Sequence, residues 1–561
     1  MYSSPSQVNQ LVSLLRAHSV TDVVVCPGSR NATIVHDLHE VADAFCLHPV
    51  TDERSAAFVA LGMALATQQA AAVCVTSGSA LLGCVPAVAE AYYRRIPLLV
   101  ISADRPSEWI GQGDGQTLPQ VGALQPYATT FALRIPHNET DRWANNRLTN
   151  EALLTLGKNG GTPVHINVPI AEPMFGFDTE SLPTERIIHR YEPQAERPLP
   201  ASVCELLAGA KMPMLLVGHY ERGDLRKEVE DLEANGQLLV MPEVISDVPG
   251  SLRMPVWDAI HWPPNEPKAW LDQDEVTEYL PDVVVHVGGN FVHKRFKQLL
   301  RRLDCKVVRI GRENEMPDTF CHLDTQVVCD ERAALAQLVE VLPRKKKEVV
   351  RAQQYFDKQA QKRMQAIEDF NQRQFDPKAK INNARLTLDE TLSLLYYSLN
   401  QQAASYTLHL GNSSAVRAAA RIFPSGTQPI LCNRGTNGIE GSVSTAVGYA
   451  LKLWGLHIVV VGDLSFFYDA NALWNTQLPD NLRIVVLNNN HGAIFDHLPG
   501  LEKSPARDRY IAAGGQTFSA RGISDAYHLD YQSASTVSEL TRLLPTWLQE
   551  GERAKLLEVM L

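Results

Sequence analysis

The chain alternates between short runs of wholly apolar residues and longer stretches in which apolar positions have helical spacing. The first short runs are DVVVC (22–26), AAAVCV (70–75), PLLVIS (97–102) and PVHINV (163–168). Runs that are apolar throughout, without alternation of polar and apolar positions, are typical of parallel strands covered by helices on both faces. The pattern therefore predicts an α/β protein built from doubly wound, mainly parallel sheets.

Two further groups of apolar runs follow, and polar segments separate them. One group is MLLVG (214–218), QLLVM (237–241), DVVVHVGG (282–289) and CKVVRIG (305–311); the other is YTLHLGN (406–412), PILCN (429–433), HIVVVGD (457–463), LRIVVLNNN (482–490) and KLLEVML (555–561). A chain of 561 residues also exceeds the ~250–300 residues at which a single core stops growing. We therefore predict three domains, at 1–185, 195–343 and 376–561, with a linker helix over 344–375.

No segment of the chain predicts a membrane anchor or a secretion signal. Residues 56–89 carry no charge, but Gln68, Gln69 and the TSGS segment at 76–79 interrupt the apolar run. The stretch fits a helix, a buried strand, a turn and a second helix. The first twenty residues lack a basic start, an apolar core and a cleavage site, and they predict an ordinary amphipathic helix. We expect no membrane insertion.

Charge and cysteine content narrow the partners and the compartment. The formal net charge of -11 argues against nucleic acid as the main partner. The lysines at 345–347 fit the start of the polar linker helix better than a nucleic-acid patch. The nine cysteines are scattered without zinc-ligand spacing, which indicates reduced thiols and a cytoplasmic location. An anionic ligand must therefore be bound by a few placed cations.

Two of the apolar runs end in hydrogen-bonding side chains. HIVVV is followed by Gly462 and Asp463, and LRIVVL by Asn488, Asn489 and Asn490. The carboxyl ends of parallel strands meet at one edge of a sheet, so these oxygens are expected side by side. Carboxylate and amide oxygens suit Mg²⁺, and the backbone amides of Leu464 and Ser465 suit phosphates. The alternative is that Asp463 caps a helix and the asparagines form a turn.

This spacing resembles the GD…NN motif of thiamin-diphosphate-dependent enzymes. The resemblance implies that Asp463, Asn489 and the backbone carbonyl of His491 bind Mg²⁺. It also implies that Gly462, Leu464 and Ser465 contact the diphosphate. Leu464 replaces the usual glycine, and His491 stands where glycine is common.

A glutamate far from this motif fits the same family. The family uses a glutamate in its first domain to hydrogen-bond the aminopyrimidine of the coenzyme and so activate it. The segment FCLHPVTDERSAAF places Glu53 at the start of an apolar helix, and the resemblance implies that Glu53 is catalytic. The alternative is a first-turn acid that complements the helix dipole. The family also implies a homodimer, or a dimer of dimers, because Glu53 and Asp463 meet across a subunit interface.

Several segments look like one branch of this family, the 2-succinyl-5-enolpyruvyl-6-hydroxy-3-cyclohexene-1-carboxylate synthases of menaquinone biosynthesis. The segments are PGSRN (27–31), TDER (51–54), TSGSA (76–80), ADRP (103–106), GDGQ (113–116), HKR (293–295), GNSSAVR (411–417), NRGTNGIEG (433–441), GDLSFFYD (462–469) and NNNHGAIF (488–495). The resemblance implies a transferase that decarboxylates 2-oxoglutarate on thiamin diphosphate and adds the succinyl carbanion to isochorismate.

Two other functions remain open at this point. One is another thiamin-diphosphate-dependent 2-oxoacid decarboxylase or carboligase. The other is a non-catalytic nucleotide-binding protein, although no G-x-G-x-x-G follows a strand.

Both implied substrates are dianions, which makes cationic residues the candidate substrate ligands. In the matching motifs these are Arg30, Arg105, Lys294, Arg417 and Arg434, with Ser29, Gln116 and Ser413 as neutral hydrogen-bonding partners. Ile494 and Phe495 would form an apolar wall, Ile439 would bend the cofactor, and Ser413 would also contact it. Each residue has an ordinary alternative as a turn, helix-surface or core residue.

Overall fold

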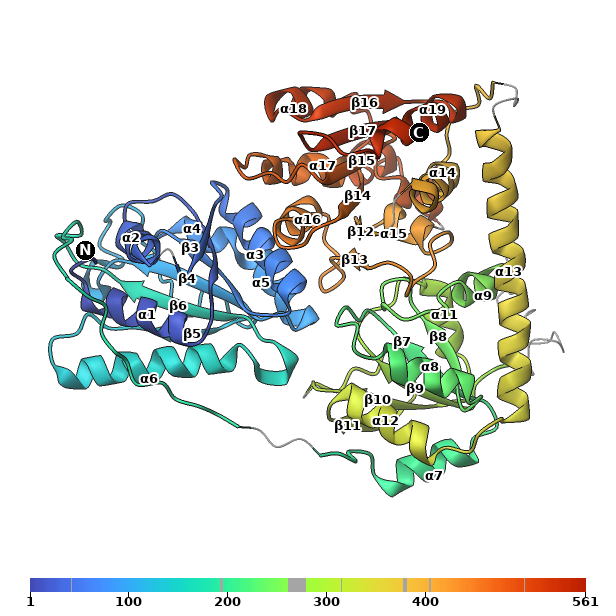
Figure 1. The fold of residues 1–561 in the computed structure, drawn as a ribbon, viewed down its shortest axis with the longest axis horizontal. Coiled ribbons are helices and arrows are strands. Elements are labelled where there is room, and N and C mark those ends of the chain that lie inside the picture. The colour runs from blue at the N-terminus through green and yellow to red at the C-terminus, as the bar shows by residue number, and fades with distance from the viewer. Residues whose placement is uncertain are drawn as a thin grey trace.

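The computed structural model describes residues 1–41, 43–191, 195–260, 279–313, 315–376, 381–402, 405–498 and 500–561. It contains three wholly parallel sheets with helices between their strands (Figure 1). This confirms the predicted fold class. Residues 192–194, between the first and second predicted domains, lie outside the described residues.

The first sheet has six strands in the order β2-β1-β3-β4-β6-β5. Its strands are β1 Asp22–Val25, β2 Cys46–Pro49, β3 Ala71–Val75, β4 Leu98–Asp104, β5 Thr129–Ala132 and β6 Val164–Pro169. Its helices are α1 Ser6–Ala17, α2 Ala32–Glu40, α3 Glu53–Thr67, α4 Ser79–Gly83, α5 Val85–Arg94 and α6 Glu139–Thr155. The uncharged stretch 56–89 thus forms helix, strand, turn and helices, as predicted.

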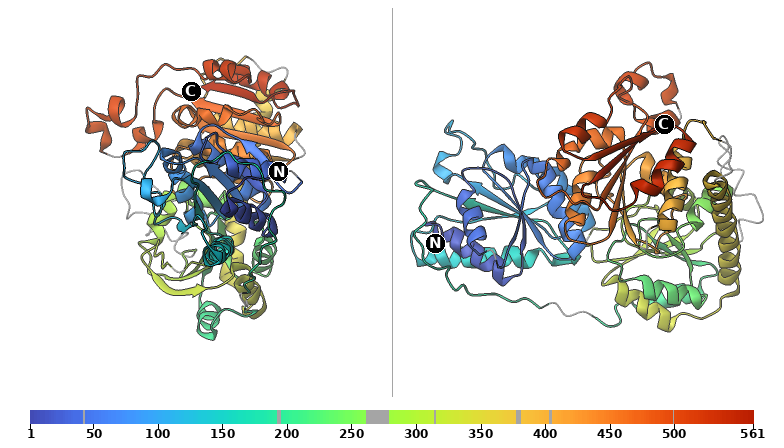
Figure 2. Two further views of the ribbon diagram at one scale, coloured as in Figure 1. Left: turned by 90° about the vertical axis from the view of Figure 1, so that its left-hand side faces the viewer. Right: turned by 45° about the horizontal axis from the view of Figure 1, so that its top comes forward.

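The second sheet has five strands in the order β11-β10-β9-β7-β8. Its strands are β7 Pro213–Val217, β8 Leu239–Pro242, β9 Val283–Val287, β10 Lys306–Gly311 and β11 Leu323–Val328. The helices are α7 Ala201–Gly209, α8 Arg226–Ala234, α9 Arg253–Ile260, α11 Lys294–Leu300 and α12 Glu331–Val341. The long helix α13, Lys347–Phe375, then runs along the second and third sheets (Figures 1 and 2).

The third sheet repeats the winding of the first, with the order β13-β12-β14-β15-β17-β16. Its strands are β12 Tyr406–Leu410, β13 Ile430–Cys432, β14 Leu456–Gly462, β15 Leu482–Asn488, β16 Asp530–Ala534 and β17 Lys555–Met560. Its helices are α14 Leu388–Gln402, α15 Ser414–Ala419, α16 Ser442–Ala450, α17 Asp463–Tyr468, α18 Arg521–Ala526 and α19 Val537–Trp547. No helix within the described ranges is both long and apolar enough to cross a membrane.

The first and third sheets share one hydrophobic core. A single cluster of buried side chains includes Val73 and Val100 of the first sheet and Val459 and Ile484 of the third, with α3 and α16 between them. Figure 2 shows the two units packed against each other through these helices. The two sheets therefore form one packed body rather than two independently buried units.

Two glycines allow α3 and α16 to pack with their backbones in contact. A Cβ atom on Gly62 would lie 2.1 Å from the carbonyl oxygen of Thr445, and one on Gly448 would lie 2.0 Å from that of Val59. Both distances are shorter than any real Cβ contact. Any larger side chain at either position must push the helices apart.

We predict that Gly448→Ala destabilises the protein by roughly 1–3 kcal/mol, because overpacking at a backbone contact forces the helices to separate. Thermal unfolding followed by circular dichroism measures the effect. Gly209→Ala is the control, since a Cβ at Gly209 meets no atom within 4 Å. Equal melting temperatures for Gly448→Ala and the parent would contradict the close contact.

Candidate active site

The carboxyl ends of four adjacent strands of the third sheet lie side by side. The loops that follow them hold most of the predicted site: 411–413 after β12, 433–441 after β13, 462–465 after β14 and 488–491 after β15. Residue 413 has a positive φ of 70°, which is unusual for a serine. The sheet thus brings Ser413, Arg434, Ile439, Asp463 and Asn489 to one side, as the strand order requires.

Asp463 presents a buried carboxylate at the end of β14. Asp463 is only 6% exposed, and one of its carboxylate oxygens accepts a 2.9 Å hydrogen bond from the Leu464 amide. Burial raises the pKa of Asp463, although the amides of Leu464 and Asn490 and the His491 ring act in the opposite direction. No Lys or Arg in the described residues forms an ion pair with it. A buried carboxylate of this kind fits a divalent cation.

Asn488 and Asn489 have different contacts in the turn after β15. The Asn488 amide donates to Glu558 at 2.7 Å and to the Phe518 carbonyl at 3.0 Å, so it holds the strand end. The Asn489 side-chain oxygen accepts a 3.3 Å hydrogen bond from the His491 amide. The Asn489 oxygen therefore carries one long hydrogen bond and keeps a lone pair for a metal ion.

The His491 side chain braces this turn. Its Nδ1 lies 2.9 Å from the Asn489 carbonyl oxygen, and its Nε2 lies 2.7 Å from Asp496, which raises the pKa of His491. The His491 carbonyl accepts a 3.0 Å bond from the Ala493 amide, which leaves one lone pair for a ligand. The imidazole thus fits beside the predicted carbonyl ligand without replacing it.

A helix follows β14 without an intervening loop. Helix α17 begins at Asp463 itself, and a short 3-10 helix, Ala470–Leu473, follows it. Asp463 occupies the first helical position directly after Gly462, so the helix starts as soon as the strand ends. The Leu464 amide is therefore engaged by the Asp463 carboxylate, while a Cβ on Gly462 would meet open space.

Hydrogen bonds join the neighbouring loops of this edge. The Ser465 hydroxyl donates to the Ile439 carbonyl at 2.5 Å. The Asn412 amide donates to the Asn433 and Gly438 carbonyls, each at 2.6 Å. The Ile439 side chain is 39% exposed although it is large and apolar. The loops form one connected frame that presents Ile439 to an open space beside Ser465.

A cationic cluster lies where the third sheet meets the second. Arg434 is 6% exposed and donates to Asn412 at 3.1 Å and to the Phe291 carbonyl at 3.4 Å. Burial and the nearby Arg434 charge lower the pKa of Arg417. Burial, Arg434 and Arg301 likewise lower the pKa of Lys297. These cations repel one another, and a bound anion would relieve the repulsion.

The positions of Lys294, Ile494 and Phe495 say less about their function. Lys294 is the exposed first residue of α11, one turn before the half-buried Lys297. Ile494 and Phe495 are half-buried in the short 3-10 helix Ala493–His497 that follows the asparagine turn. A Cβ on Gly492 would lie 2.9 Å from the Phe495 ring, so the ring covers this turn.

The predicted residues of the first domain gather at the carboxyl edge of the first sheet. Buried Arg30 donates to the Ile170 carbonyl at 3.0 Å and contacts Glu172 at 3.4 Å. Arg105 forms a 2.8 Å ion pair with Asp114 and lies 3.8 Å from Glu172.

Ser29 and Gln116 lie on loops of the same edge and are exposed. The Gln116 backbone lies against Gly78, where a Cβ would be 3.1 Å away. The first-domain residues therefore form one group around two guanidinium groups.

Glu53 is the first residue of α3, at the predicted position. Its neighbour Asp52 caps the helix, accepting hydrogen bonds from the Arg54 amide at 2.9 Å and the Ser55 amide at 3.1 Å. Within the described residues the Glu53 carboxylate has no hydrogen bond or ion pair. Asp52 thus performs the capping function, and the Glu53 side chain is left for another partner.

Contacts join the start of α3 to the segment after α17. The Asp52 carboxylate accepts from the Asn471 amide at 2.6 Å, and Arg54 donates to the Tyr468 carbonyl at 2.7 Å and lies over its ring. No contact between described residues joins Glu53, Arg30 or Arg105 to Asp463 or Arg434. One chain therefore carries two groups of predicted site residues on two sheet edges.

Sequence reasoning missed three contributors. Lys297 lies one turn beyond the HKR segment, and helical spacing from Lys294 would have found it. Asn412 and Asn433 stand inside the GNSS and NRGTNG segments, but their framing hydrogen bonds depend on how the loops meet.

Comparisons with known proteins identify the class. Residues 7–124 match the family model described as "Thiamine pyrophosphate enzyme, N-terminal TPP binding domain". This match, with the fold and the site residues at the strand ends, defines a thiamin-diphosphate-dependent enzyme.

Full-length relatives identify the branch. A Bacteroides fragilis protein is 39% identical over 98% of this chain and 94% of its own length. A Bacteroides thetaiotaomicron protein is 38% identical over 100% and 96%, and a Phocaeicola vulgatus protein 36% identical over 100% and 96%. All three are named 2-succinyl-5-enolpyruvyl-6-hydroxy-3-cyclohexene-1-carboxylate synthase. The chain belongs to this synthase family, which confirms the prediction of a thiamin-diphosphate-dependent transferase of this branch.

We predict a pH-dependent stability from Asp469, which ties the end of α17 to α16. This carboxylate is fully buried and accepts bonds from the Ser444 amide at 2.8 Å and hydroxyl at 2.7 Å. Burial raises the pKa of Asp469 to about 6 from 3.8, although Ser444 and Arg54 act in the opposite direction. The fold thus favours the protonated form, so its contribution is complete below pH 4 and lost as the pH rises through 6.

The expected size is roughly 1–3 kcal/mol between pH 4 and pH 7. Urea unfolding of the parent and of Asp469→Asn measures it, because the variant cannot titrate at this position. The parent should lose stability relative to the variant as the pH rises. A difference that stays constant over this range would show that Asp469 does not titrate there.

Proposed function

We propose that this protein decarboxylates 2-oxoglutarate and adds the resulting succinyl unit to isochorismate, in a reaction that uses thiamin diphosphate and Mg²⁺. The observation that carries the substrate assignment is the cationic cluster of Lys297, Arg417 and Arg434 beside the sheet edge that also holds Asp463. An acidic protein that concentrates positive charge at this edge is built for an anionic substrate. The synthase name that the relatives share agrees with a product that contains the succinyl unit.

The residues of the third domain would hold the diphosphate end of the cofactor. Bound thiamin diphosphate would supply the electron sink that permits loss of CO₂. Asp463, Asn489 and the His491 carbonyl would bind Mg²⁺, which prefers such oxygen ligands. Gly462, Leu464, Ser465 and Ser413 border the space for the phosphates, and Ile439 would contact the ring system.

Glu53 would be the acid–base residue. It would hold or move a proton at the aminopyrimidine, and a carboxylate without a hydrogen-bond or ion-pair partner among the described residues is free to do so. Because Glu53 and Asp463 lie on separate edges of one chain, we propose that the protein works as a homodimer or a dimer of dimers. Each cofactor would then contact Glu53 of one chain and Asp463 of another.

The arginines would bind and orient the two dianions. The Nε of Arg434 is buried and lacks a hydrogen-bond partner among the described residues, so this guanidinium keeps a donor for a carboxylate. Arg30 and Arg105, with Ser29 and Gln116, would supply the second cationic group, and Lys294 and the apolar pair Ile494 and Phe495 would border the space. The nine free cysteines support a cytoplasmic location.

The test of this function is the reaction itself. Purified protein is supplied with thiamin diphosphate, Mg²⁺ and 2-oxoglutarate, with and without isochorismate, and the product is sought by mass spectrometry. We expect a product that contains the succinyl unit and isochorismate. Product formation with pyruvate but not with 2-oxoglutarate would instead indicate another carboligase of the same class.

We predict that Glu53→Gln lowers CO₂ release from 2-oxoglutarate by about 100-fold or more, because the amide cannot exchange the proton. Binding of thiamin diphosphate, followed by calorimetry, should change far less. Asp463→Asn should show the opposite pattern, with loss of Mg²⁺-dependent cofactor binding. Undiminished CO₂ release in Glu53→Gln would remove this glutamate from the mechanism.

A further inference from the structure

The loop of residues 433–441, here called the Arg434 loop, carries two residues of the proposed site, Arg434 and Ile439. Its two ends are closed by a 3.1 Å hydrogen bond from the Asn433 side chain to the Gly441 carbonyl. The same side chain donates to the Thr445 hydroxyl at 3.0 Å, which ties the loop to α16. What holds the middle of the loop therefore decides where the Arg434 guanidinium lies.

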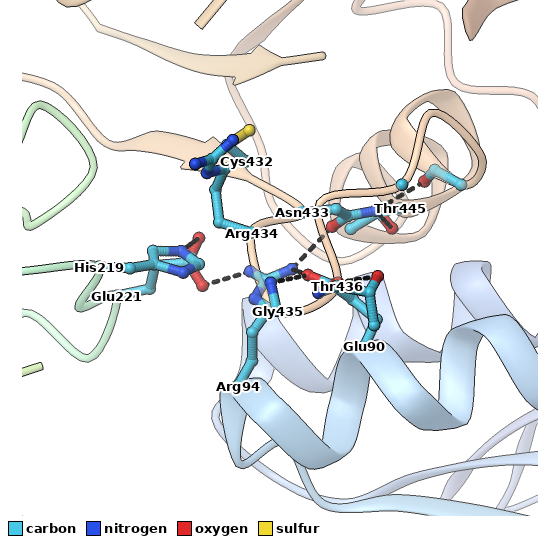
Figure 3. A network of polar contacts seen from close by, with 12 residues as sticks. Glu90, Arg94, His219, Glu221, Cys432, Asn433, Arg434, Gly435, Thr436 and Thr445 are labelled. Atoms are coloured by element: carbon cyan, nitrogen blue, oxygen red, sulfur yellow. Dashed lines mark hydrogen bonds and ion pairs between the residues drawn. The ribbon is translucent and has the colours of Figure 1, made fainter. Parts of the chain in front are cut away.

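A glutamate of the first domain holds the middle of this loop. Glu90, on α5, is 1% exposed and accepts hydrogen bonds from the Gly435 amide at 2.8 Å and the Thr436 amide at 2.7 Å. It also accepts from the Thr436 hydroxyl at 2.9 Å. Figure 3 shows this carboxylate directly beneath the turn of the loop. Two consecutive amides on one buried carboxylate fix the backbone next to Arg434.

Close contact explains why the loop has glycine at 435. A Cβ on Gly435 would lie 2.8 Å from the Glu90 carbonyl oxygen and 2.9 Å from its carboxylate. The loop backbone therefore lies against α5 with no room for a side chain. The contact is specific to this geometry, because a shift of the loop would break both amide bonds together.

Arg94 extends the network to all three domains. Its side chain is 2% exposed, donates to the Asn433 side-chain oxygen at 2.7 Å, and lies 3.5 Å from Glu90 on the same helix. It also pairs with Glu221 of the second domain (Figure 3). Although burial acts in the opposite direction, the Glu221 and Glu90 charges raise the pKa of Arg94. Arg94 and Glu221 therefore form an ionised pair inside the protein.

The network borders a cavity on one side of the loop. Arg434 and Gly435 line a cavity of about 630 Å³ together with Arg94, His219 and Glu221. The contacts from α5 hold Gly435 and Thr436, while Asn412 donates to the Asn433 and Gly438 carbonyls and Asn290 donates to the Arg434 carbonyl at 3.2 Å. Buried charges with good hydrogen bonds give such positional definition, whereas removal of one partner leaves another uncompensated.

We propose that Glu90, with Arg94, is a positioning residue that acts through Arg434 to set the anion-binding geometry of the active site. Both side chains are almost fully buried, and each contacts the Arg434 loop. The proposal rests on the proposed function for its kinetic test, but its structural content does not. A displacement of about 1 Å in a binding group can cost up to roughly 100-fold in rate.

The kinetic test is a double-variant cycle in the purified full-length enzyme with both cofactors. Arg434→Lys first identifies the substrate whose KM depends on the guanidinium. Glu90→Gln should raise the KM of that same substrate about tenfold or more, with a smaller change for the other substrate. In Arg434→Lys, the added Glu90→Gln change should alter this KM by less than about twofold, because its target is gone.

The matched control is Glu151→Gln. Glu151 also pairs with an arginine one helical turn away, Arg147 at 2.7 Å, but the two side chains are 53% and 44% exposed. This variant should keep the parent KM for both substrates. If Glu90→Gln does not fold, Thr436→Val serves instead, because it removes only the hydroxyl bond to Glu90 and should raise the same KM by a few-fold.

Hydrogen exchange separates this inference from the proposed function. In Glu90→Gln the amides of the peptide 433–441 should exchange faster than in the parent, whether or not the enzyme uses 2-oxoglutarate and isochorismate. Unchanged protection of that peptide overturns the inference. Effects of Glu90→Gln and Arg434→Lys that multiply in the double variant also overturn it, since the two residues would then act independently.

Discussion

The backbone contact between α3 and α16 is the constraint on which the other features depend. Gly62 and Gly448 let the two helices approach closely, and their apolar faces complete one core shared by the first and third sheets. The shared core fixes the start of α3, where Glu53 lies, relative to α16. The Arg434 loop ends where α16 begins, so the same contact also sets one anchor of that loop.

Opposite charges are kept apart at the edge of the third sheet. Asp463 is buried and pairs with no Lys or Arg of the described residues, whereas Lys297, Arg417 and Arg434 form a cluster whose charge Glu243 partly offsets. The first arrangement suits a metal ion and the second suits carboxylates. Since the whole chain is acidic, this local separation of charge is what would distinguish cofactor from substrate at one sheet edge.

The fold was predictable wherever a strand is buried on both faces. The runs at β1, β3, β4, β6, β7, β8, β9, β10, β12, β13, β14, β15 and β17 were all recognisable as apolar segments. The strands that escaped such recognition, β2, β5, β11 and β16, are edge strands with mixed exposure and therefore lack an apolar run. The other two edge strands, β8 and β13, are buried and keep one.

The site was predictable only as far as a motif follows a strand. Asp463 and Asn489 could be placed because each comes directly after a buried run, and Glu53 because it opens an apolar helix. Glu90 could not, because its position in the Ala-rich helix α5 says nothing of the loop it meets 345 residues later. Long-range polar contacts depend on how domains pack, which local patterns do not encode.

We propose that Glu53 and Asp463 of different chains serve one cofactor. Co-expression of Glu53→Gln and Asp463→Asn chains tests it, with mixed oligomers confirmed by native mass spectrometry. Each variant alone should be nearly inactive. The random mixture of dimers should recover up to about a quarter of the parent activity, because about half of the dimers are mixed and one of the two sites in each mixed dimer has both native residues. Mixed dimers without recovered activity would contradict the claim.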